Sequence, residues 1–230
     1  MGEYFDVVRQ AVVARLSRQR RAPSGLGRAE ALAAKELALP ETALTRWAAD
    51  ACRQRSEPWL SEHCVRTYIW GALFARSDGL AFDAEILAAA SLLHDLGLAL
   101  PPAAPGGTCF AVRGARESRR LLASQPVDDA RRERIAEAIS LHLNVRVPPS
   151  QGTEAHLVHE GAAFDVVGAR WRDVRPADRL AVLAIHPRQD LKRRLVPVFQ
   201  EQASRSPRTR IAVLCRLRFL KLIQSSPFEE

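Results

Sequence analysis

Apolar residues recur along most of the chain at spacings of three and four residues, which is the period of an amphipathic helix. Clusters of Val and Ile, which would indicate strands, are short. We therefore expect an all-α fold. The expected helices cover residues 3–20, 28–37, 41–54, 58–76, 83–98, 114–124, 128–142, 153–169, 175–184, 188–203 and 207–224.

Several helix ends have physical markers in the sequence. Pro58 can occupy a first helical turn without losing a hydrogen bond, and Asp83 is a plausible N-cap before the run AEILAAASLL. Gly97 and the Pro101-Pro102 pair are expected to end that apolar helix. The following run, PPAAPGG, cannot be helical and must form a surface loop, either the rim or lid of a pocket or a simple connector.

The chain of 230 residues can bury one sizeable core, and we expect a single globular unit. Its expected parts are a helical N-terminal flank over 1–55, a core over 56–185, and C-terminal helices over 186–230 that pack on this core. The longest apolar stretch, near 80–100, is interrupted by acids and a histidine, so it predicts a buried helix and no membrane span.

The formal net charge is +8, and nearly all of the positive charge is arginine. A basic surface favours anionic partners, so a small-molecule substrate is expected and can be anionic. The arginines are scattered and lack interleaved aromatic residues, so no specific nucleic-acid binding is expected. The acidic residues of the first segment are unlike a signal peptide. The oligomeric state is left open.

Four cysteines stand at positions 52, 64, 109 and 215, without any CxxC spacing. This spacing excludes a zinc ribbon and, without a secretory signal, is typical of reduced thiols. A cytoplasmic location is therefore expected.

Four residues fall in the order that a four-ligand metal site requires: His63, the adjacent His94 and Asp95, and Asp165. Imidazole nitrogens and carboxylate oxygens suit a divalent transition metal such as Zn, Fe, Mn or Ni. His94 and Asp95 lie in a segment of Ala and Leu, where an acid is seldom buried without a partner or a metal. The alternative is that Asp95 pairs with an arginine and His94 is an ordinary core histidine.

Helix geometry distinguishes among the other candidate ligands. Glu154 lies eleven residues before Asp165, close to three whole turns, so the two carboxylates share a face if the helix is continuous. His156 points away from this face and His159 is displaced from it, so both are expected at the surface or against a partner. His142 ends the amphipathic run RIAEAISLH.

The segments HCVRTYIWG, AASLLHDLG, FAVRGA, AISLH and GAAFDVVG resemble the HD superfamily of metal-dependent phosphohydrolases, and within it the cyanamide-hydratase-like HD proteins. The resemblance covers about residues 56–170, with looser similarity toward the C-terminus. It implies an HD-domain helical bundle whose metal pattern, H…HD…D, maps onto His63, His94, Asp95 and Asp165. It also places a histidine, His142, near the metal.

The expected activity is water activation on a divalent metal. Asp95 can ligate the metal and accept the proton of the water, while His142 can donate a proton, orient the substrate or bind a second ion. Arg66 shares the helix face of His63, so it can hold a substrate anion or neutralise a buried acid such as Asp95 or Glu154. The predicted catalytic residues are therefore Asp95, His142 and Arg66, with Arg113 as a further anion-binding candidate.

Several functions remain open. The first is hydrolysis of a small phosphorylated or nucleotide-like substrate, and the second is hydration of a small nitrile-type substrate. A small neutral substrate needs a tight pocket without an arginine clamp, so pocket size separates these two. A diiron oxygenase is more distant. Outside enzymes, an HD-like shell can serve as a ligand-binding or scaffold domain.

Overall fold

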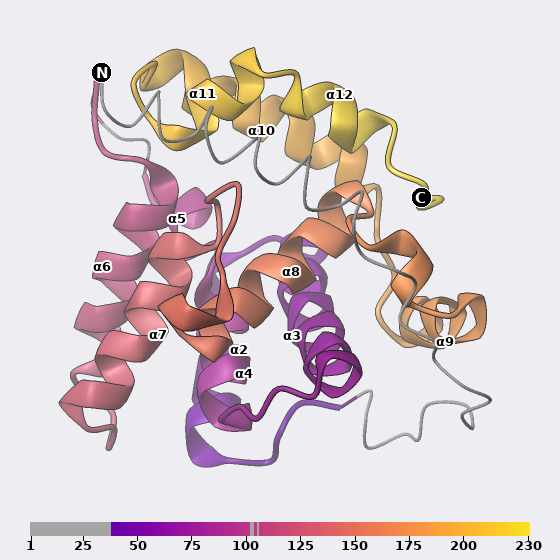
Figure 1. Ribbon diagram of the computed structural model, residues 1–230. Coiled ribbons are helices and arrows are strands. Elements are labelled where there is room, and N and C mark those ends of the chain that lie inside the picture. Colours follow the sequence, from indigo (N-terminus) through magenta and orange to yellow (C-terminus); the bar gives the residue numbers. More distant parts are fainter. Residues whose placement is uncertain (1–37, 102–103, 105) are drawn as a thin grey trace.

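The computed structural model describes residues 38–101, 104 and 106–230, and no strand occurs in these ranges (Figure 1). The all-α prediction is confirmed, whereas the expected helices 3–20 and 28–37 lie outside the described residues. The α-helices are α2 (Ala43–Arg55), α3 (Pro58–Asp78), α4 (Ala84–Leu93), α5 (Leu96–Ala99), α6 (Phe110–Leu122), α7 (Asp129–Leu141), α8 (Thr153–Val167), α9 (Pro176–Ile185), α10 (Leu191–Arg205), α11 (Arg210–Arg216) and α12 (Phe219–Gln224). Two 3₁₀ turns, η2 (Pro149–Gln151) and η3 (Trp171–Asp173), flank α8.

Two predicted helix starts are confirmed. Pro58 is the first residue of α3, and the Asp83 carboxylate caps α4 by accepting hydrogen bonds from the backbone N–H groups of Glu85 and Ile86. Because the first N–H groups of a helix have no partner within it, such a carboxylate stabilises the start of α4.

The expected helix 83–98 is wrong in one respect, because it is broken at His94 and Asp95. His94 ends α4, Asp95 leaves the helical backbone conformation at φ −100° and ψ 9°, and α5 then begins at Leu96. Gly97 consequently lies inside α5 and does not end a helix. The apolar sequence continues through the break, so its periodicity gives no sign of it.

Two other boundaries differ from the prediction. The expected helix 207–224 is divided into α11 and α12 at Arg218, which has a left-handed backbone at φ 67°. The expected helix 114–124 begins four residues earlier, at Phe110, because Phe110 and Ala111 are buried in the core.

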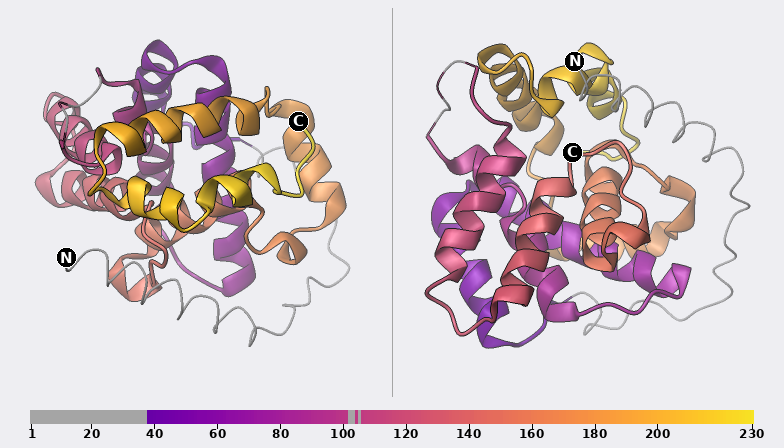
Figure 2. Two further views of the ribbon diagram at one scale, coloured as in Figure 1. Left: turned by 90° about the horizontal axis from the view of Figure 1, so that it is seen from above. Right: turned by 60° about the vertical axis from the view of Figure 1, so that its left-hand side comes forward.

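The fold is built around α3 and α8, which pack closely against each other, with α4 alongside both (Figure 1). Helix α2 covers α4, and α6 and α7 pair beside them. Helices α10, α11 and α12 run across one end of this bundle, and the view from above shows α10 beside the other two (Figure 2). Among the described helices, none combines the length and the apolar character needed to cross a membrane.

Two glycines allow the close approach of α3 and α8. A Cβ atom added to Gly161 would lie 2.2 Å from the Thr67 carbonyl oxygen, and one added to Gly71 would lie 2.9 Å from the Leu157 carbonyl oxygen. No side chain fits in either space. Asp165 follows Gly161 by one helical turn on the same face, so this contact brings the Asp165 carboxylate against α3.

We expect Gly161→Ala to reduce stability, because the new methyl group forces α8 away from α3. Overpacking of a well-packed core costs about 1–3 kcal/mol in the free energy of unfolding. Urea denaturation followed by circular dichroism measures this effect. An unchanged midpoint would contradict the close contact between the two helices.

Candidate metal centre

The break between α4 and α5 places His94 and Asp95 at a bend of the backbone. The His94 ring is fixed by its Nδ1 atom, which lies 2.7 Å from the Ser91 carbonyl oxygen. A carbonyl oxygen can only accept, so Nδ1 carries a proton, and in the neutral ring Nε2 presents a free lone pair. This tautomer is the one that binds a metal through Nε2.

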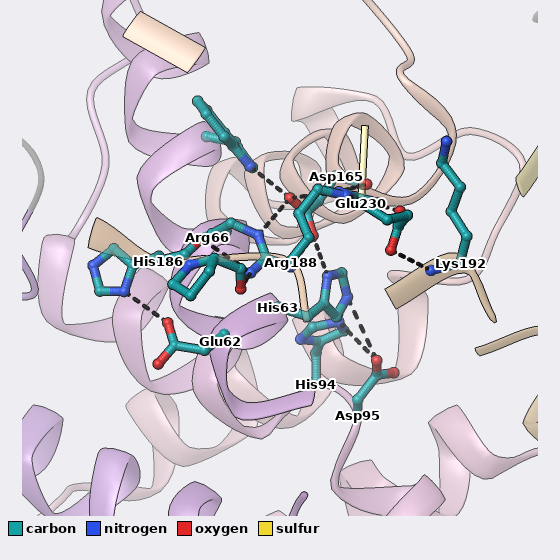
Figure 3. Close-up of polar contacts among 12 residues, drawn as sticks. Glu62, His63, Arg66, His94, Asp95, Asp165, His186, Arg188, Lys192 and Glu230 are labelled. Carbon is teal, nitrogen blue, oxygen red and sulfur yellow. Dashed lines mark hydrogen bonds and ion pairs between the residues drawn. The ribbon is translucent and has the colours of Figure 1, made fainter. Parts of the chain in front are cut away.

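His63 of α3 meets this pair from the opposite side (Figure 3). Its Nε2 atom lies 3.2 Å from His94 Nε2, and the Asp95 Oδ2 atom lies 3.6 Å from His63 Nε2 and 3.3 Å from His94 Nε2. All three residues are buried, and their candidate ligand atoms lie within 4.8 Å of one another. His63 of α3 and the adjacent pair His94 and Asp95 thus form one compact donor set.

The hydrogen bonds of the two histidines indicate that this donor set fits a cation. His63 Nδ1 lies 2.8 Å from the Asp165 carboxylate, so in the neutral ring His63 Nε2, like His94 Nε2, has no proton. The two Nε2 atoms lie 3.2 Å apart, and two neutral rings that face each other in this way need a cation between them, either a metal ion or a proton. Imidazole nitrogens with a carboxylate are suited to a divalent transition metal, and this cluster could hold such an ion.

The neighbouring charges shift the pKa values of this cluster in opposite directions. Burial would raise the pKa of Asp95, but the adjacent His94 and the other two histidines hold it well below its usual range. Burial lowers the pKa of His94, and the Asp95 carboxylate more than compensates for this, so the pKa is raised. Burial lowers the pKa of His63 despite its bond to Asp165. Asp95 is therefore ionised at neutral pH.

His142 lies beside this cluster at the end of α7. Its Nδ1 atom is 2.7 Å from the Ile139 carbonyl oxygen, and its Nε2 atom is 3.6 Å from Asp95 Oδ1. Its ring stands edge-on to that of His94, with the centroids 4.8 Å apart. Burial and the neighbouring His94 lower the pKa of His142 to about 3, so the ring is neutral at neutral pH.

Asp165 lies on the far side of the His63 ring from the cluster (Figure 3). Its Oδ2 atom accepts hydrogen bonds from His63 Nδ1 and Arg66 Nη2, both over 2.8 Å. Its Oδ1 atom accepts from Arg66 Nε and Trp70 Nε1, both over 2.9 Å. Asp165, predicted as a metal ligand, thus contacts the Nδ1 edge of His63, whereas the donor set forms at the Nε2 edge.

Electrostatics keep the Asp165 carboxylate ionised in this buried position. Burial would raise the pKa of Asp165, yet Arg66, the His63 hydrogen bond and Arg188 hold it well below its usual range. Arg188 also donates to the Asp165 backbone carbonyl over 2.7 Å, and its guanidinium stacks on the ring of Phe228. The last residues of the chain therefore help to fix Asp165.

Arg66 is fully buried and pairs with Asp165. Its remaining nitrogen, Nη1, donates to the carbonyl oxygens of His186 and Pro187 over 3.3 and 2.8 Å. The role considered for Arg66 as a neutraliser of a buried acid is thus found, but its partner is Asp165, not Asp95 or Glu154. Its contacts leave no guanidinium nitrogen directed to a substrate.

A cavity of about 1060 Å³ opens beside the cluster. His63, His94, Asp95 and His142 form part of its wall, whereas Asp165 and Arg66 do not line it in the described structure. Much of the remaining wall is apolar and comes from the segment after α7, from α8 and from the C-terminal helices, namely Leu143, Ala162, Ala163, Val166, Val167, Phe199, Leu214, Leu217, Phe219 and Leu222. The donor set is therefore accessible to a small molecule.

Comparison with known families places this cluster in context. The HD domain family matches residues 60–183, which is more than half of the chain and includes every residue of the cluster. The chain belongs to the HD domain family. No curated protein matches the chain. Membership in the family and the buried His63, His94 and Asp95 cluster together support a divalent metal site in this HD domain.

Arg113 does not lie at the metal centre of the HD domain. Its guanidinium donates to the Pro101 carbonyl oxygen, and Arg113 is not among the described residues that line the cavity. Among the described residues of the loop 101–107, none lines the cavity. The predicted anion-binding role of Arg113 therefore has no support in its position.

Glu154 is at the other end of α8 from Asp165. The helix is continuous, as its shared-face prediction requires, but Glu154 accepts a hydrogen bond from the Asp83 backbone N–H over 2.8 Å and pairs with Arg134 over 2.9 Å. It thus joins α8 to the start of α4 and to α7.

His156 was expected at the surface or against a partner, and it lies instead in the interior of the chain. It is buried and lines the cavity, because the segment after His142 covers this part of α8. Its Nδ1 atom lies 2.7 Å from the Val147 carbonyl oxygen, and its Nε2 atom has no hydrogen-bond partner in the described part of the chain. His159 is half-buried in the same wall, with Nδ1 2.9 Å from the His142 carbonyl oxygen.

Sequence reasoning missed most of the cavity wall. Phe199, Leu214 and Phe219 belong to helices that looked only like an extension of the core, and nothing in their spacing distinguishes cavity-lining residues from core residues. Trp70 is fully buried in the core. Its bond to Asp165 could have been anticipated only from the rule that a buried indole N–H usually finds an acceptor.

Proposed function

We propose that this HD domain protein is a metal-dependent hydrolase that activates water at the wall of the cavity. The observation that carries this proposal is the close approach of the Nε2 atoms of His63 and His94 beside the Asp95 carboxylate, at the wall of an open cavity. His63, His94 and Asp95 would hold the ion. A bound divalent ion would supply nucleophilic water near neutral pH, since it lowers the pKa of water to about 7.

Asp95, His142 and Arg66 would have different roles in the reaction. Asp95 is ionised, and its carboxylate is placed at the cavity wall to accept the proton of an attacking water. His142 is neutral and its Nδ1 proton is held by the Ile139 carbonyl, which speaks against the predicted role of proton donor. Arg66 acts through Asp165 and His63, as a positioning residue.

We propose a phosphorylated or nucleotide-like molecule as the substrate class. Ligand pockets typically measure about 300–1,000 Å³. The cavity of about 1060 Å³ is at the upper end of this range, so it suits a molecule as large as a nucleotide better than a small nitrile. Two arginines of the cavity wall, Arg146 and Arg172, are exposed. The third, Arg170, is neutralised by Asp78 and Asp173. The exposed pair is the source of positive charge for a substrate anion.

Hydration of a small nitrile-type substrate is the second candidate. It is favoured by the apolar character of the wall and by the positions of Arg66 and Arg113, since neither belongs to the described lining of the cavity. A neutral substrate needs no arginine there. The cyanamide-hydratase-like resemblance of the sequence stays a prediction.

The experiment that tests these proposals is a substrate screen of the metal-loaded protein against phosphomonoesters, cyclic and linear phosphodiesters, nucleotides and cyanamide. His94→Ala serves as the matched control. Turnover of a phosphate ester that depends on His94 supports the first proposal, whereas turnover of cyanamide alone favours the second. Absence of turnover throughout the panel would contradict both and favour a ligand-binding or scaffold role.

Replacement of the exposed arginines should weaken the binding of an anionic substrate. Exposed ion pairs contribute about 0.2–1 kcal/mol, so we expect Arg146→Ala or Arg172→Ala to raise KM for a phosphate ester by up to about fivefold, with kcat little changed. Steady-state kinetics measure the effect, and Arg113→Ala is the control. A larger effect of Arg113→Ala than of either cavity variant would contradict this assignment.

A further inference from the structure

The cavity of about 1060 Å³ has two chemically different parts. One part contains the candidate metal centre described above. The other part, here called the apolar wall, comes from the C-terminal helices and consists of Phe199 of α10, Leu214 of α11, Leu217 directly after α11, and Phe219 and Leu222 of α12. A molecule that fills the cavity therefore contacts polar ligand atoms in one place and hydrocarbon in another.

A row of ring contacts connects the two parts. The His142 ring, beside the metal centre, lies against the ring of Phe110, with the two centroids 5.8 Å apart. Phe110 stacks on Phe199 with a centroid distance of 5.8 Å, and Phe199 stacks on Phe219 with a centroid distance of 6.0 Å. The apolar wall is thus joined to the metal centre through these rings and continues to α12.

Two leucines of the apolar wall expose much of their surface. Leu217 is 40% exposed and Leu222 is 54% exposed, and both line the cavity. Among the described residues, two other large apolar side chains are as exposed, namely Leu180 and Ile185 of α9, and neither lines the cavity. Apolar surface that lines a cavity and stays open to water is typical of a ligand-binding site.

Two polar side chains of the cavity wall already have partners within the protein. Arg170 pairs with Asp78 and Asp173, and the Asn144 side-chain oxygen accepts a hydrogen bond from Arg210. These groups therefore need no sugar hydroxyl or base of a ligand to satisfy them. The apolar wall, in contrast, gains free energy when the hydrocarbon of a ligand replaces the water that contacts it.

We propose that the substrate is a phosphate ester of an apolar alcohol, with its phosphate at the metal centre and its hydrocarbon chain against the apolar wall. This inference rests on the proposed hydrolase function and narrows its substrate class, since a nucleotide would place a polar sugar and base against Leu217 and Leu222. Hydrolysis would break the bond between phosphorus and the ester oxygen. Water would supply a hydroxyl group to the phosphorus and a proton to the departing alcohol.

Calorimetric titration of the Zn²⁺-loaded full chain with butyl-, hexyl-, octyl- and decylphosphonate tests the proposal. These probes resist hydrolysis and share one headgroup, so differences in affinity below their micelle concentrations report on the hydrocarbon alone. We expect the affinity to rise by about two- to fourfold per methylene, since burial of one CH₂ contributes up to about this factor. 2-Hydroxyethylphosphonate is the polar control and should bind more weakly than butylphosphonate. An affinity that stays constant along the series would overturn the proposal.

His94→Ala separates a failure of this inference from a failure of the proposed function. If the headgroup lies at the metal centre, the variant should weaken all four phosphonates by a similar factor and keep the dependence on chain length. Affinities that do not depend on His94 would contradict the proposed function. A constant affinity along the series in a protein that hydrolyses phosphate esters would contradict the apolar wall alone.

Leu222→Gln and Leu180→Gln form a matched pair of variants. Both leucines are exposed, by 54% and 70%, so both variants should fold, but only Leu222 lines the cavity. We expect Leu222→Gln to weaken decylphosphonate by about fivefold and Leu180→Gln to leave its affinity unchanged. Equal effects of the two variants would overturn the proposal. A dimer that becomes a monomer in Leu222→Gln, with the chain-length dependence intact, would assign the apolar wall to a second copy of the chain and would also overturn it.

Discussion

Asp95→Ala is expected to abolish metal retention and to lower turnover by at least about a thousandfold, since a bound ion lowers the pKa of water by several units. The Nε2 atoms of His63, His94 and His142 all lie beside the Asp95 carboxylate, so its loss removes the only carboxylate among these four residues. Inductively coupled plasma mass spectrometry measures the metal content, and kinetics on the substrate found in the screen measure turnover.

The same variant should keep most of its helix content. Helix α4 is held by the buried apolar residues of its own sequence, and Asp95 follows its end, outside the regular helix. His94→Ala is the parallel variant and should behave alike in circular dichroism. Complete unfolding on loss of the metal would instead assign the ion a structural role and would contradict the catalytic interpretation.

Arg66→Met is expected to lower the free energy of unfolding by about 3–5 kcal/mol, because it removes one partner of a buried ion pair and leaves the other charge in the interior. Arg66 is fully buried and bonds both oxygens of Asp165. It also holds the carbonyl oxygens of His186 and Pro187, which join α9 to α10. Denaturant titration measures the loss.

Arg113→Met is the matched control, since Arg113 is partly exposed and bonds a single loop carbonyl. Changes at such surface positions are usually within about 0.5 kcal/mol. Equal stability losses in the two variants would contradict the special position of Arg66. Asp165→Asn combined with Arg66→Met should be less than additive, because the two side chains form one pair.

The helices could largely be predicted from the sequence because their signals are local. The three-and-four-residue pattern, the proline at position 58 and the capping carboxylate of Asp83 each act within a few residues. The break after His94 was missed for the opposite reason. Nothing near it disfavours helix, and the bend is associated with packing against α3, which is distant in sequence. Arg218 likewise adopts a left-handed backbone that its residue type does not announce.

The metal cluster could be predicted in part because its residue types are unusual for their surroundings. A histidine and an acid within a run of Ala and Leu need a partner, and His63 and His94 do meet at Asp95. The rotation of α8 against α3 could not be predicted, since it depends on the contact at Gly161. That rotation decides that Asp165 meets Arg66 and the Nδ1 edge of His63.

The burial of His156 could not be predicted either. A helical wheel gives the direction of a side chain relative to its own helix, but not which other segment covers that face. Here the residues after His142 cover it, and the Val147 carbonyl bonds the His156 ring. The C-terminal helices complete the cavity in the same non-local way.

Metal titration of the wild-type protein tests the central claim most directly. The protein is purified without added metal, its content is measured by elemental analysis, and the stripped protein is titrated with Zn²⁺, Fe²⁺, Mn²⁺ and Ni²⁺ in a calorimeter. We expect about one tightly bound ion per chain, held at His63, His94 and Asp95. A protein that retains no metal and binds none of the four ions would contradict the account.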